Sequence, residues 1–456
     1  MKQSMTRKLR LLATTVCLSA MLVLAGCGET AQPESSTTES QESTSQEQSG
    51  QEQNQGGHLS SLLGKWEMIA EISTGYYEYF QDSGCTIEVY EEDGKYRLDY
   101  IHNWYDYTEL CGMVLEETTQ PKYAGLEAAD WYGVFSRRTE SNVTYQLVKL
   151  TEDTVKLQIH AEYSYEEDGQ TVEDAMDTYY VYVKADSPNR EQVETEYQYR
   201  NTVTVSNTLE LFQAVADNTR IILKAGKYNI SELTPEERCS ANLNHDRDYE
   251  TGEEISYPWD SLYAADMHDI MLEGEEGAEV IISTEDAYAA PLCFMNCSRI
   301  SLKNLTVGHD VEPGYCAGSV LALSFTNNVR VENCRLYGSG TYGIEAESCY
   351  DIRVENSDIY ECTYGLVRLY STGRSYFRNC TLKDSVGFTM FSLDEVWDTE
   401  FKDCAIRDNF VSYEDEAFIS ANDGGVTFDS CTFQGNRYSY LKNGSVTMKN
   451  CTLDDN

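Results

Sequence analysis

The stretch ENCRL, residues 332–336, is one of seven five-residue segments with the same pattern in the second half of the chain. The other six are KNLTV at 303–307, ENSDI at 355–359, RNCTL at 378–382, KDCAI at 402–406, DSCTF at 429–433 and KNCTL at 449–453. The second residue of each segment, here called the landmark, recurs at intervals of 20 to 29 residues. A repeat of this length indicates a solenoid, in which each coil buries its apolar face against its neighbours.

Apolar residues stand at fixed offsets from the landmarks, which are Asn304, Asn333, Asn356, Asn379, Asp403, Ser430 and Asn450. Two residues before and three residues after each landmark the side chain is apolar, as at Val331 and Leu336. This pattern predicts two short strands with inward-facing apolar residues, and a turn at the landmark between them. A third strand per coil is predicted at 342–346, 365–369 and 388–393.

Three short strands per coil with a recurring turn Asn resemble the right-handed parallel β-helix of the pectate-lyase-like superfamily. The resemblance covers about residues 200–456 and implies that the landmark asparagines form a hydrogen-bonded ladder between coils. We therefore predict an all-β protein with a parallel β-helix domain at 187–456. A short amphipathic helix at 208–217 would cap its first coil, and 234–262 is predicted to be a loop.

Cysteines follow the landmark in five of the seven segments, for example at Cys334 and Cys380. One Cys per coil is typical of packing, because a small, polarisable thiol stacks well between coils. Zinc ligation is the alternative, but no CxxC spacing is present, so no metal site is predicted. The thiols could be reduced, or partly bridged between coils.

An antiparallel β-barrel domain is predicted at 59–186. Alternating strands rich in Tyr, Val and Thr occur there with two Asp-Gly turns, at 93–94 and 168–169. The Gly64-Lys65-Trp66 sequence resembles the first strand of lipocalin-like barrels. Several other barrels and sandwiches would also fit strands of this length.

The N-terminus predicts export and lipid anchoring. Residues 1–26 join a basic start to an apolar run of signal-peptide length and end in Leu24-Ala25-Gly26, directly before Cys27. This resembles the lipobox of bacterial lipoproteins and implies that Cys27 carries a membrane lipid. The alternative is an ordinary secretory signal. Residues 27–58 are rich in Ser, Gln and Glu, and predict a disordered tether at an extracytoplasmic membrane surface.

The net charge of the chain limits the classes of molecule that it can bind. The chain of 456 residues has 34 Lys and Arg against 77 Asp and Glu, for a net charge of −43. Such a protein repels nucleic acids, which are therefore excluded as partners. It would also repel anionic polysaccharides, unless a local basic patch or a bound cation intervened.

Six polar residues are predicted to point outward on three successive coils, where enzymes of the resembled superfamily act. Three of them could act in lyase or hydrolase chemistry, and three could bind a ligand. The catalytic candidates are Glu345, Arg368 and Asp394, and the binding candidates are Glu347, Tyr370 and Ser392. The alternative is a solvated polar strand face without a function.

Two functions fit this sequence. The first is binding of a glycan or another cell-envelope polymer along the β-helix, and the second is a polysaccharide lyase or glycoside hydrolase; a structural spacer without a ligand is a third interpretation. The paired-Asp and Gly-His-Gly motifs of polygalacturonases are absent, and the nearest stretch is Gly308-His309-Asp310. No cofactor is evident, although the oxygen-rich stretch at 245–250 could hold Ca²⁺.

Overall fold

The computed structural model describes residues 59–73, 76–81, 83–102, 108–115, 131–135, 143–167, 170–239, 243, 245–247, 254–256, 260–283, 289–312 and 315–454. The chain divides into two units, residues 1–198 and 199–456. The predicted signal peptide, the tether and Cys27 lie outside the described residues. No helix in the described part of the chain is long and apolar enough to cross a membrane.

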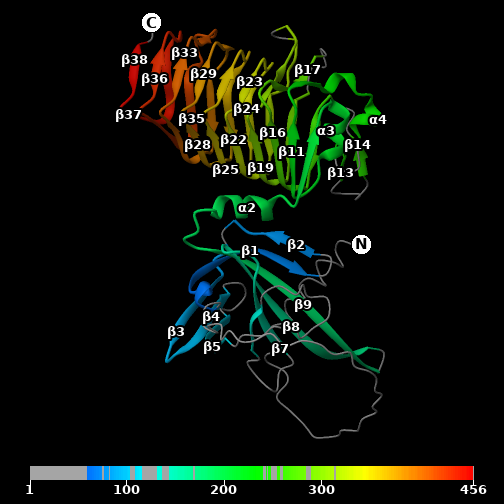
Figure 1. Cartoon of the computed structure of the whole chain (residues 1–456). Helices are drawn as coiled ribbons and strands as arrows, with labels where there is room; N and C mark the ends of the chain where they lie inside the picture. Colours follow the sequence, from blue (N-terminus) through cyan, green and yellow to red (C-terminus); the bar gives the residue numbers. More distant parts are fainter. Residues whose placement is uncertain are drawn as a thin grey trace, which may run out of the picture. The chain divides into compact units, whose positions relative to one another are not determined.

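The first unit is an antiparallel sheet with the strand order β5-β4-β3-β1-β9-β8-β7-β6, and β2 pairs with β1 (Figure 1). A 3₁₀ turn, η1 (Leu59–Leu62), precedes it. The strands are β1 (Gly64–Ser73), β2 (Tyr76–Tyr79), β3 (Thr86–Glu92), β4 (Lys95–His102), β5 (Thr108–Val114), β6 (Trp131–Phe135), β7 (Val143–Lys149), β8 (Thr154–Glu167) and β9 (Gln170–Lys184).

Sequence features explain this sheet. Asp93 and Gly94 join β3 to β4 with φ angles of 53° and 69°, the conformation that a tight hairpin turn requires. Trp66 is fully buried in the core, and its Nε1 donates to the carbonyl oxygen of Leu62 at 2.8 Å. The predicted antiparallel sheet is confirmed.

Helix α2 (Arg190–Gln198) was not expected from the sequence. Its Val193 and Tyr197 pack on the buried cluster that contains Ile69 and Val181. Arg190 adds an ion pair of 2.6 Å with Glu67 of β1. None of the helix residues is fully buried, which explains why apolar periodicity did not reveal it.

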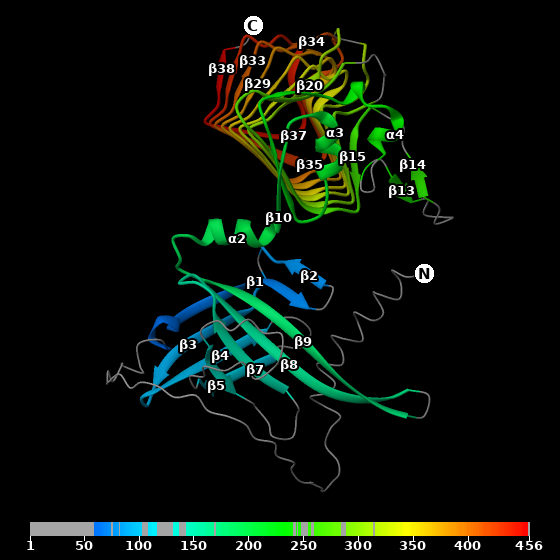
Figure 2. The same ribbon diagram turned by 45° about the vertical axis from the view of Figure 1, so that its right-hand side comes forward.

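The second unit is a parallel β-helix whose repeating coils build three stacks of strands (Figure 2). Stack A contains β15 (Leu262–Ala265), β18 (Leu292–Met295), β21 (Leu321–Ser324), β24 (Tyr342–Glu347), β27 (Gly365–Tyr370) and β31 (Phe391–Asp394). Stack B contains β10 (Asn201–Val205), β11 (Thr219–Leu223), β16 (His268–Gly274), β19 (Ser298–Lys303), β22 (Asn327–Glu332), β25 (Tyr350–Glu355), β28 (Gly373–Arg378) and β32 (Trp397–Lys402).

Stack C contains β12 (Gly226–Asn229), β17 (Ala278–Ile282), β20 (Thr306–His309), β23 (Arg335–Tyr337), β26 (Asp358–Tyr360), β29 (Thr381–Lys383), β33 (Ala405–Arg407), β36 (Thr432–Gln434) and β38 (Thr452–Asp454). Strands β35 (Ala417–Asp429) and β37 (Tyr440–Lys449) extend stacks A and B together. The predicted parallel β-helix is confirmed, with the third strand of each coil in stack A.

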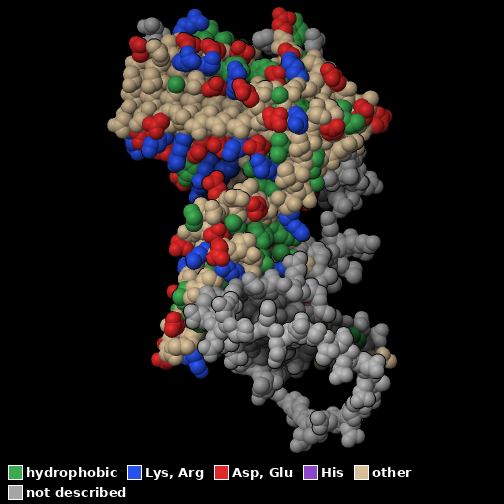
Figure 3. Space-filling view, in the orientation of Figure 1, with side chains coloured by type: hydrophobic (Ala, Val, Ile, Leu, Met, Phe, Trp, Pro, Cys, Tyr) green, Lys and Arg blue, Asp and Glu red, His purple; other side chains and the backbone are tan. Residues whose placement is uncertain are grey.

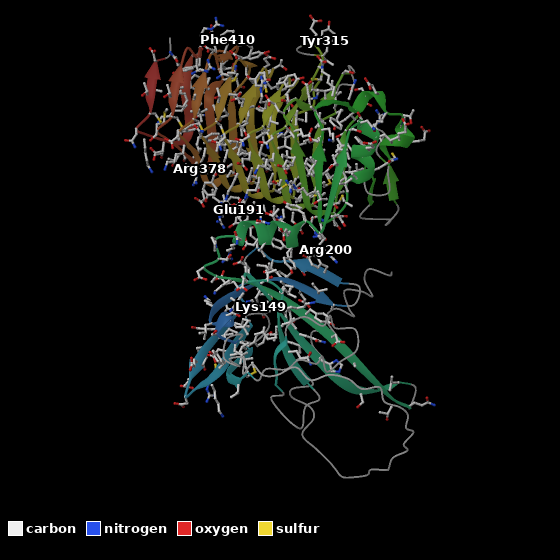
Figure 4. The ribbon with its side chains drawn as sticks, in the orientation of Figure 1. Lys149, Glu191, Arg200, Tyr315, Arg378 and Phe410 are labelled. Carbon is white, nitrogen blue, oxygen red and sulfur yellow. The ribbon has the colours of Figure 1, made fainter. Side chains whose placement is uncertain are left out.

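The segment from the end of each stack C strand to the following stack A strand is called the C–A segment. It carries two short paired strands, β30 (Val386–Gly387) and β34 (Phe410–Val411). Phe410, in this segment, and Arg378, at the end of β28, lie at opposite edges of the unit (Figure 4).

The first coil is capped by α3 (Thr208–Ala214), where the side chain of Asn207 accepts a hydrogen bond from the amide of Glu210. The predicted helix at 208–217 therefore exists but ends at Ala214. The segment predicted as a loop at 234–262 contains α4 (Pro235–Arg238), β13 (His245–Arg247) and β14 (Glu254–Ser256) in its described part. The 3₁₀ turn η2 (Ile230–Glu232) precedes it.

Every landmark has a positive φ, between 51° and 58°. Asn, Asp and Ser suit this position, because their short polar side chains tolerate the left-handed conformation better than apolar ones do. The predicted ladder is confirmed for two pairs: Asn333 donates to Asn304 at 3.3 Å, and Asn379 donates to Asn356 at 2.7 Å. These landmark side chains are exposed.

Four of the five cysteines that directly follow a landmark are buried, the fifth, Cys451, is half-buried, and all five are unbridged. Four of these thiols donate to a carbonyl of the preceding coil, for example Cys380 to Val354 at 3.3 Å; the other three are Cys404, Cys431 and Cys451. The sequence predicted packing and left bridging between coils open, and the structure adds a hydrogen bond between coils.

A second polar ladder lies inside the solenoid and was not predicted. Asn409 and Asn436 are fully buried at the start of successive C–A segments. The side chain of Asn409 accepts from the Ser385 amide at 3.1 Å, and the Ser385 hydroxyl accepts from the Cys362 amide at 3.0 Å. This ladder satisfies backbone groups that the turns leave without strand partners.

Candidate functional site

The six predicted site residues lie on the outward side of three neighbouring stack A strands. Glu345 and Glu347 are on β24, Arg368 and Tyr370 on β27, and Ser392 and Asp394 on β31. The strand register aligns them in two rows that run across the strands, Glu345-Arg368-Ser392 and Glu347-Tyr370-Asp394. They alternate with buried residues such as Ile344 and Leu369, which hold the strands on the core.

The first row contains an ion pair between Arg368 Nη1 and Glu345 Oε1. The side chains are 46% and 31% exposed. Partial burial opposes the charged form of Arg368, but the hydrogen bond and the charge of Glu345, with smaller contributions from Tyr342 and Glu347, together outweigh it and raise the pKa of the guanidinium. Arg368 is therefore a permanent cation that already has a carboxylate partner.

The second row is bonded to the turn and to the next coil. Tyr370 donates from its hydroxyl to Glu395 at 3.4 Å, and the negative charge of Glu395 raises the pKa of this phenol. Asn422 of β35 donates to Asp394 at 2.9 Å. These contacts fix hydroxyl and carboxylate groups on a rigid strand surface, where a ligand with many hydroxyls could bind them.

Tyr342 belongs to the same face and was missed as a site residue, although the sequence placed it in the third strand. A Cβ on Gly365 would lie 2.7 Å from its ring, so glycine leaves the space that the ring occupies. Burial raises the pKa of Tyr342, and a hydrogen bond with Ser392 opposes this shift. Beside it, Thr389 donates to Glu416 at 2.7 Å.

Three aromatic side chains form a second feature that sequence reasoning missed. Tyr364, Phe388 and Tyr413, called here the aromatic ladder, lie on successive C–A segments. The ring centroids of Tyr364 and Phe388 are 4.8 Å apart, and those of Phe388 and Tyr413 are 4.3 Å apart at an interplanar angle of 10°. Tyr364 is 44% exposed and Tyr413 47%.

A signal for the ladder was present in the sequence. Tyr364 directly precedes β27, and Phe388 lies three residues before β31, within the segment predicted as the third strand. The variable length of the C–A segments concealed their alignment. The backbone of Phe388 donates to the carbonyl of Tyr364 at 2.8 Å, which sets the two residues side by side.

The catalytic candidates do not form a close carboxylate pair. Glu345 and Asp394 lie two strands and two residues apart, which is roughly 12 Å between Cα atoms for ordinary strand spacing. Carboxylates of glycosidases are roughly 5–9.5 Å apart. Glu345 is also engaged in the ion pair with Arg368.

The remaining candidates are structural or lie outside the described residues. His309 is 2% exposed and its Nε2 lies 2.8 Å from the Ala289 carbonyl oxygen. Burial lowers the pKa of His309, so the ring is neutral at pH 7. The Ca²⁺ candidate at 245–250 has described backbone only at His245–Arg247. Within the described ranges, no group of three His, Cys, Asp or Glu could hold a metal ion.

Comparisons with known proteins agree with the solenoid. Residues 261–392 match the family model of the right handed beta helix region. A search of curated proteins finds no match.

Solved structures similar to the chain include the Yersinia enterocolitica Family 28 exopolygalacturonase, at 10% identity and a TM-score of 0.28, with 70% of this chain and 88% of that chain covered. Another is ORF18 of Geobacillus virus E2, at 8% identity and a TM-score of 0.31, with 65% of this chain and 67% of that chain covered. A third is tailspike protein 2 from Escherichia coli O157:H7 bacteriophage CAB120, at 9% identity and a TM-score of 0.28, with coverage of 84% and 55%.

Proposed function

We propose that this protein binds a polysaccharide along stack A, between the aromatic ladder and the two polar rows. The ladder is the observation that carries the proposal. Exposed aromatic rings stack against the apolar C–H faces of sugar rings, and the neighbouring carboxylates and hydroxyls accept hydrogen bonds from sugar hydroxyls. Three rings on consecutive coils would serve consecutive parts of a polymer.

Binding fits the geometry better than turnover. The Glu345 carboxylate is paired with Arg368, Asp394 accepts a hydrogen bond from Asn422, and the two do not form the close carboxylate pair that glycosidases use. Stacked aromatic rings and a polar strand face need no catalytic group. We therefore assign Glu347, Tyr370 and Ser392 to binding, together with Tyr364, Phe388 and Tyr413.

The proposal places this site outside the cytoplasm. The lipobox-like sequence supports lipid attachment at Cys27, and residues 27–58 would then act as a tether to the outer face of the membrane. The resemblance of the Gly64-Lys65-Trp66 strand to lipocalin-like barrels supports a related barrel fold for the first unit.

Affinity electrophoresis of the full chain in a mild detergent, through gels that contain single polysaccharides, tests the proposal. The panel runs with and without Ca²⁺, and each incubation is also assayed for new reducing or unsaturated ends. A bound polymer should retard the protein without release of ends. Replacing Tyr364 and Tyr413 together by Ala should weaken binding about 10- to 100-fold, since each exposed aromatic ring is expected to contribute roughly 0.7–1.4 kcal/mol.

The matched control is Tyr350→Ala. Tyr350 is 41% exposed and lies on stack B, away from the proposed site. The Tyr350→Ala variant should be retarded by the polysaccharide gels as strongly as the unmodified chain. The proposal fails if no polymer retards the protein, or if the Tyr364 and Tyr413 double variant binds as well as the unmodified chain. Release of new ends would favour the lyase or hydrolase alternative.

A further inference from the structure

The proposed site has a strongly one-sided charge. On the four coils that carry it, the stretches from the end of stack C through stack A are residues 338–347, 361–370, 384–394 and 408–422. They contain nine Asp and Glu residues and a single Lys or Arg, which is Arg368. Glu345, Glu347, Asp394 and Glu416 lie on or beside the polar rows. Two of the nine, Asp384 and Asp408, are paired with Lys383 and Arg407 at the ends of stack C strands. Around the polar rows an incoming anion therefore meets mainly carboxylates.

The one cation of the site is already neutralised. Arg368 is paired with Glu345 across neighbouring strands, so its guanidinium is not free to bind a ligand carboxylate. Other basic side chains gather at another edge of the unit, where Arg378 and Lys402 lie side by side in the register of β28 and β32 (Figures 3 and 4). That edge is opposite the C–A segments, and thus lies far from the ladder.

We propose that the ligand is an uncharged polysaccharide that lies along the solenoid axis, and that the Glu345–Arg368 pair excludes polyuronates. This inference rests on the proposed function and adds the ligand class and the chain direction. The direction follows from the ladder, because its rings succeed one another from coil to coil and thus across the strands. Neutral sugars offer hydroxyl donors to the carboxylates, whereas a carboxylate on each sugar ring would be repelled.

The test offers each polymer backbone in an uncharged and a carboxylated form. The pairs are dextran and carboxymethyl-dextran, β-1,3-glucan and its carboxymethyl derivative, hydroxyethylcellulose and carboxymethylcellulose, and methyl-esterified and free polygalacturonate. Affinities of the full chain are measured at low ionic strength with EDTA, so that divalent cations cannot bridge carboxylates. The backbone that binds should bind at least about tenfold more tightly in its uncharged form.

Two variants isolate the role of the ion pair. Glu345→Gln removes one carboxylate and frees Arg368, so the carboxylated form should gain about 3- to 10-fold in affinity while the uncharged form changes little. The double variant Glu345→Gln with Arg368→Ala should lose that gain. Arg378→Ala is the control, because it removes a guanidinium outside the proposed site. It should change the affinity for neither the uncharged nor the carboxylated polymer.

The outcomes separate this inference from the proposed function. Ladder-dependent binding in which the carboxylated form is bound equally or more tightly would overturn the inference and leave polysaccharide binding in place. If Glu345→Gln does not narrow the difference in affinity between the uncharged and the carboxylated polymer, the proposed role of the ion pair is wrong. Absence of any ladder-dependent binding would remove the proposed function, and the inference with it.

Discussion

Asn409 donates from its Nδ2 to Oδ1 of Asn436 at 2.9 Å inside the solenoid, one coil away. Both side chains are fully buried. The second Nδ2 hydrogen bond of Asn409 reaches the carbonyl of Leu382 at 3.1 Å, so one amide joins three coils. In a core made mostly of apolar side chains, such a bonded amide fixes the register between coils.

Replacing Asn409 by Ala should destabilise the β-helix by about 2–4 kcal/mol, because it removes the side-chain acceptor of the Ser385 amide and the hydrogen bonds to the Leu382 carbonyl and to Asn436. Urea unfolding of the second unit, followed by far-UV circular dichroism, measures the change. Asn379→Gly is the control: it removes an exposed ladder amide at a positive φ that glycine adopts freely, and should cost less than about 1 kcal/mol. Equal losses would contradict a special role for the buried ladder.

The first unit should lose stability as the pH rises toward 7. Glu71 lies opposite Glu78 on β1 and β2, and burial followed by the Glu78 charge raises the pKa of Glu71 from 4.5 to about 7. The folded state thus holds a proton that the unfolded state releases between these values. The stability that this bound proton contributes to the first unit is fully present below about pH 4.5 and is lost as the pH rises through 7.

Glu71→Gln should therefore stabilise the first unit by about 1–3 kcal/mol at pH 8 and change little at pH 4.5. Thermal unfolding at both pH values measures this difference. Glu91→Gln, at an exposed position of β3, serves as the control and should show no such pH dependence. A gain for Glu71→Gln that is equal at both pH values would contradict the raised pKa.

Gly387→Ala should disturb the aromatic ladder. A Cβ at Gly387 would lie 2.3 Å from the Thr363 carbonyl oxygen, so the backbone next to Phe388 must shift. We expect a loss of about 1–3 kcal/mol in stability and reduced polysaccharide retention. Gly425→Ala is the matched control, because a Cβ at Gly425 would lie 3.9 Å from its nearest neighbour, the Ser445 carbonyl oxygen. It should be tolerated, and equal effects of the two changes would argue against this steric explanation.

The stacked thiols should be protected from alkylation in the folded protein. A hydrogen bond with Cys380, together with burial, raises the pKa of Cys404 to about 12. Since the thiolate is the reactive form, Cys404 should react with iodoacetamide at pH 8 at least about 100-fold more slowly than the half-exposed Cys451. Peptide mass spectrometry after a timed pulse measures both rates. Equal labelling, or recovery of a disulfide-linked peptide, would contradict a reduced and packed stack.

The seven repeated segments of the sequence were enough to predict most of the fold of the second unit. The landmark asparagines and the apolar residues at fixed offsets were enough to predict parallel strands, turns and inward faces, because each coil repeats the same local conformation. The same counting placed Glu345, Arg368 and Asp394 outward on neighbouring strands, as β24, β27 and β31 show. Period-two alternation likewise identified the antiparallel sheet.

Only the tertiary structure decided which of these outward residues touch. The ion pair of Arg368 with Glu345 depends on the register between strands that are 23 residues apart in the chain. The aromatic ladder arises from C–A segments of unequal length, so no fixed offset aligns its residues in the sequence. Asn409 and Asn436 do share an offset, since each lies six residues after a landmark, but only the stacking of coils shows that their side chains are hydrogen-bonded. Local periodicity therefore specified the coil, whereas contacts between coils, which depend on stacking of distant segments, created the candidate binding face.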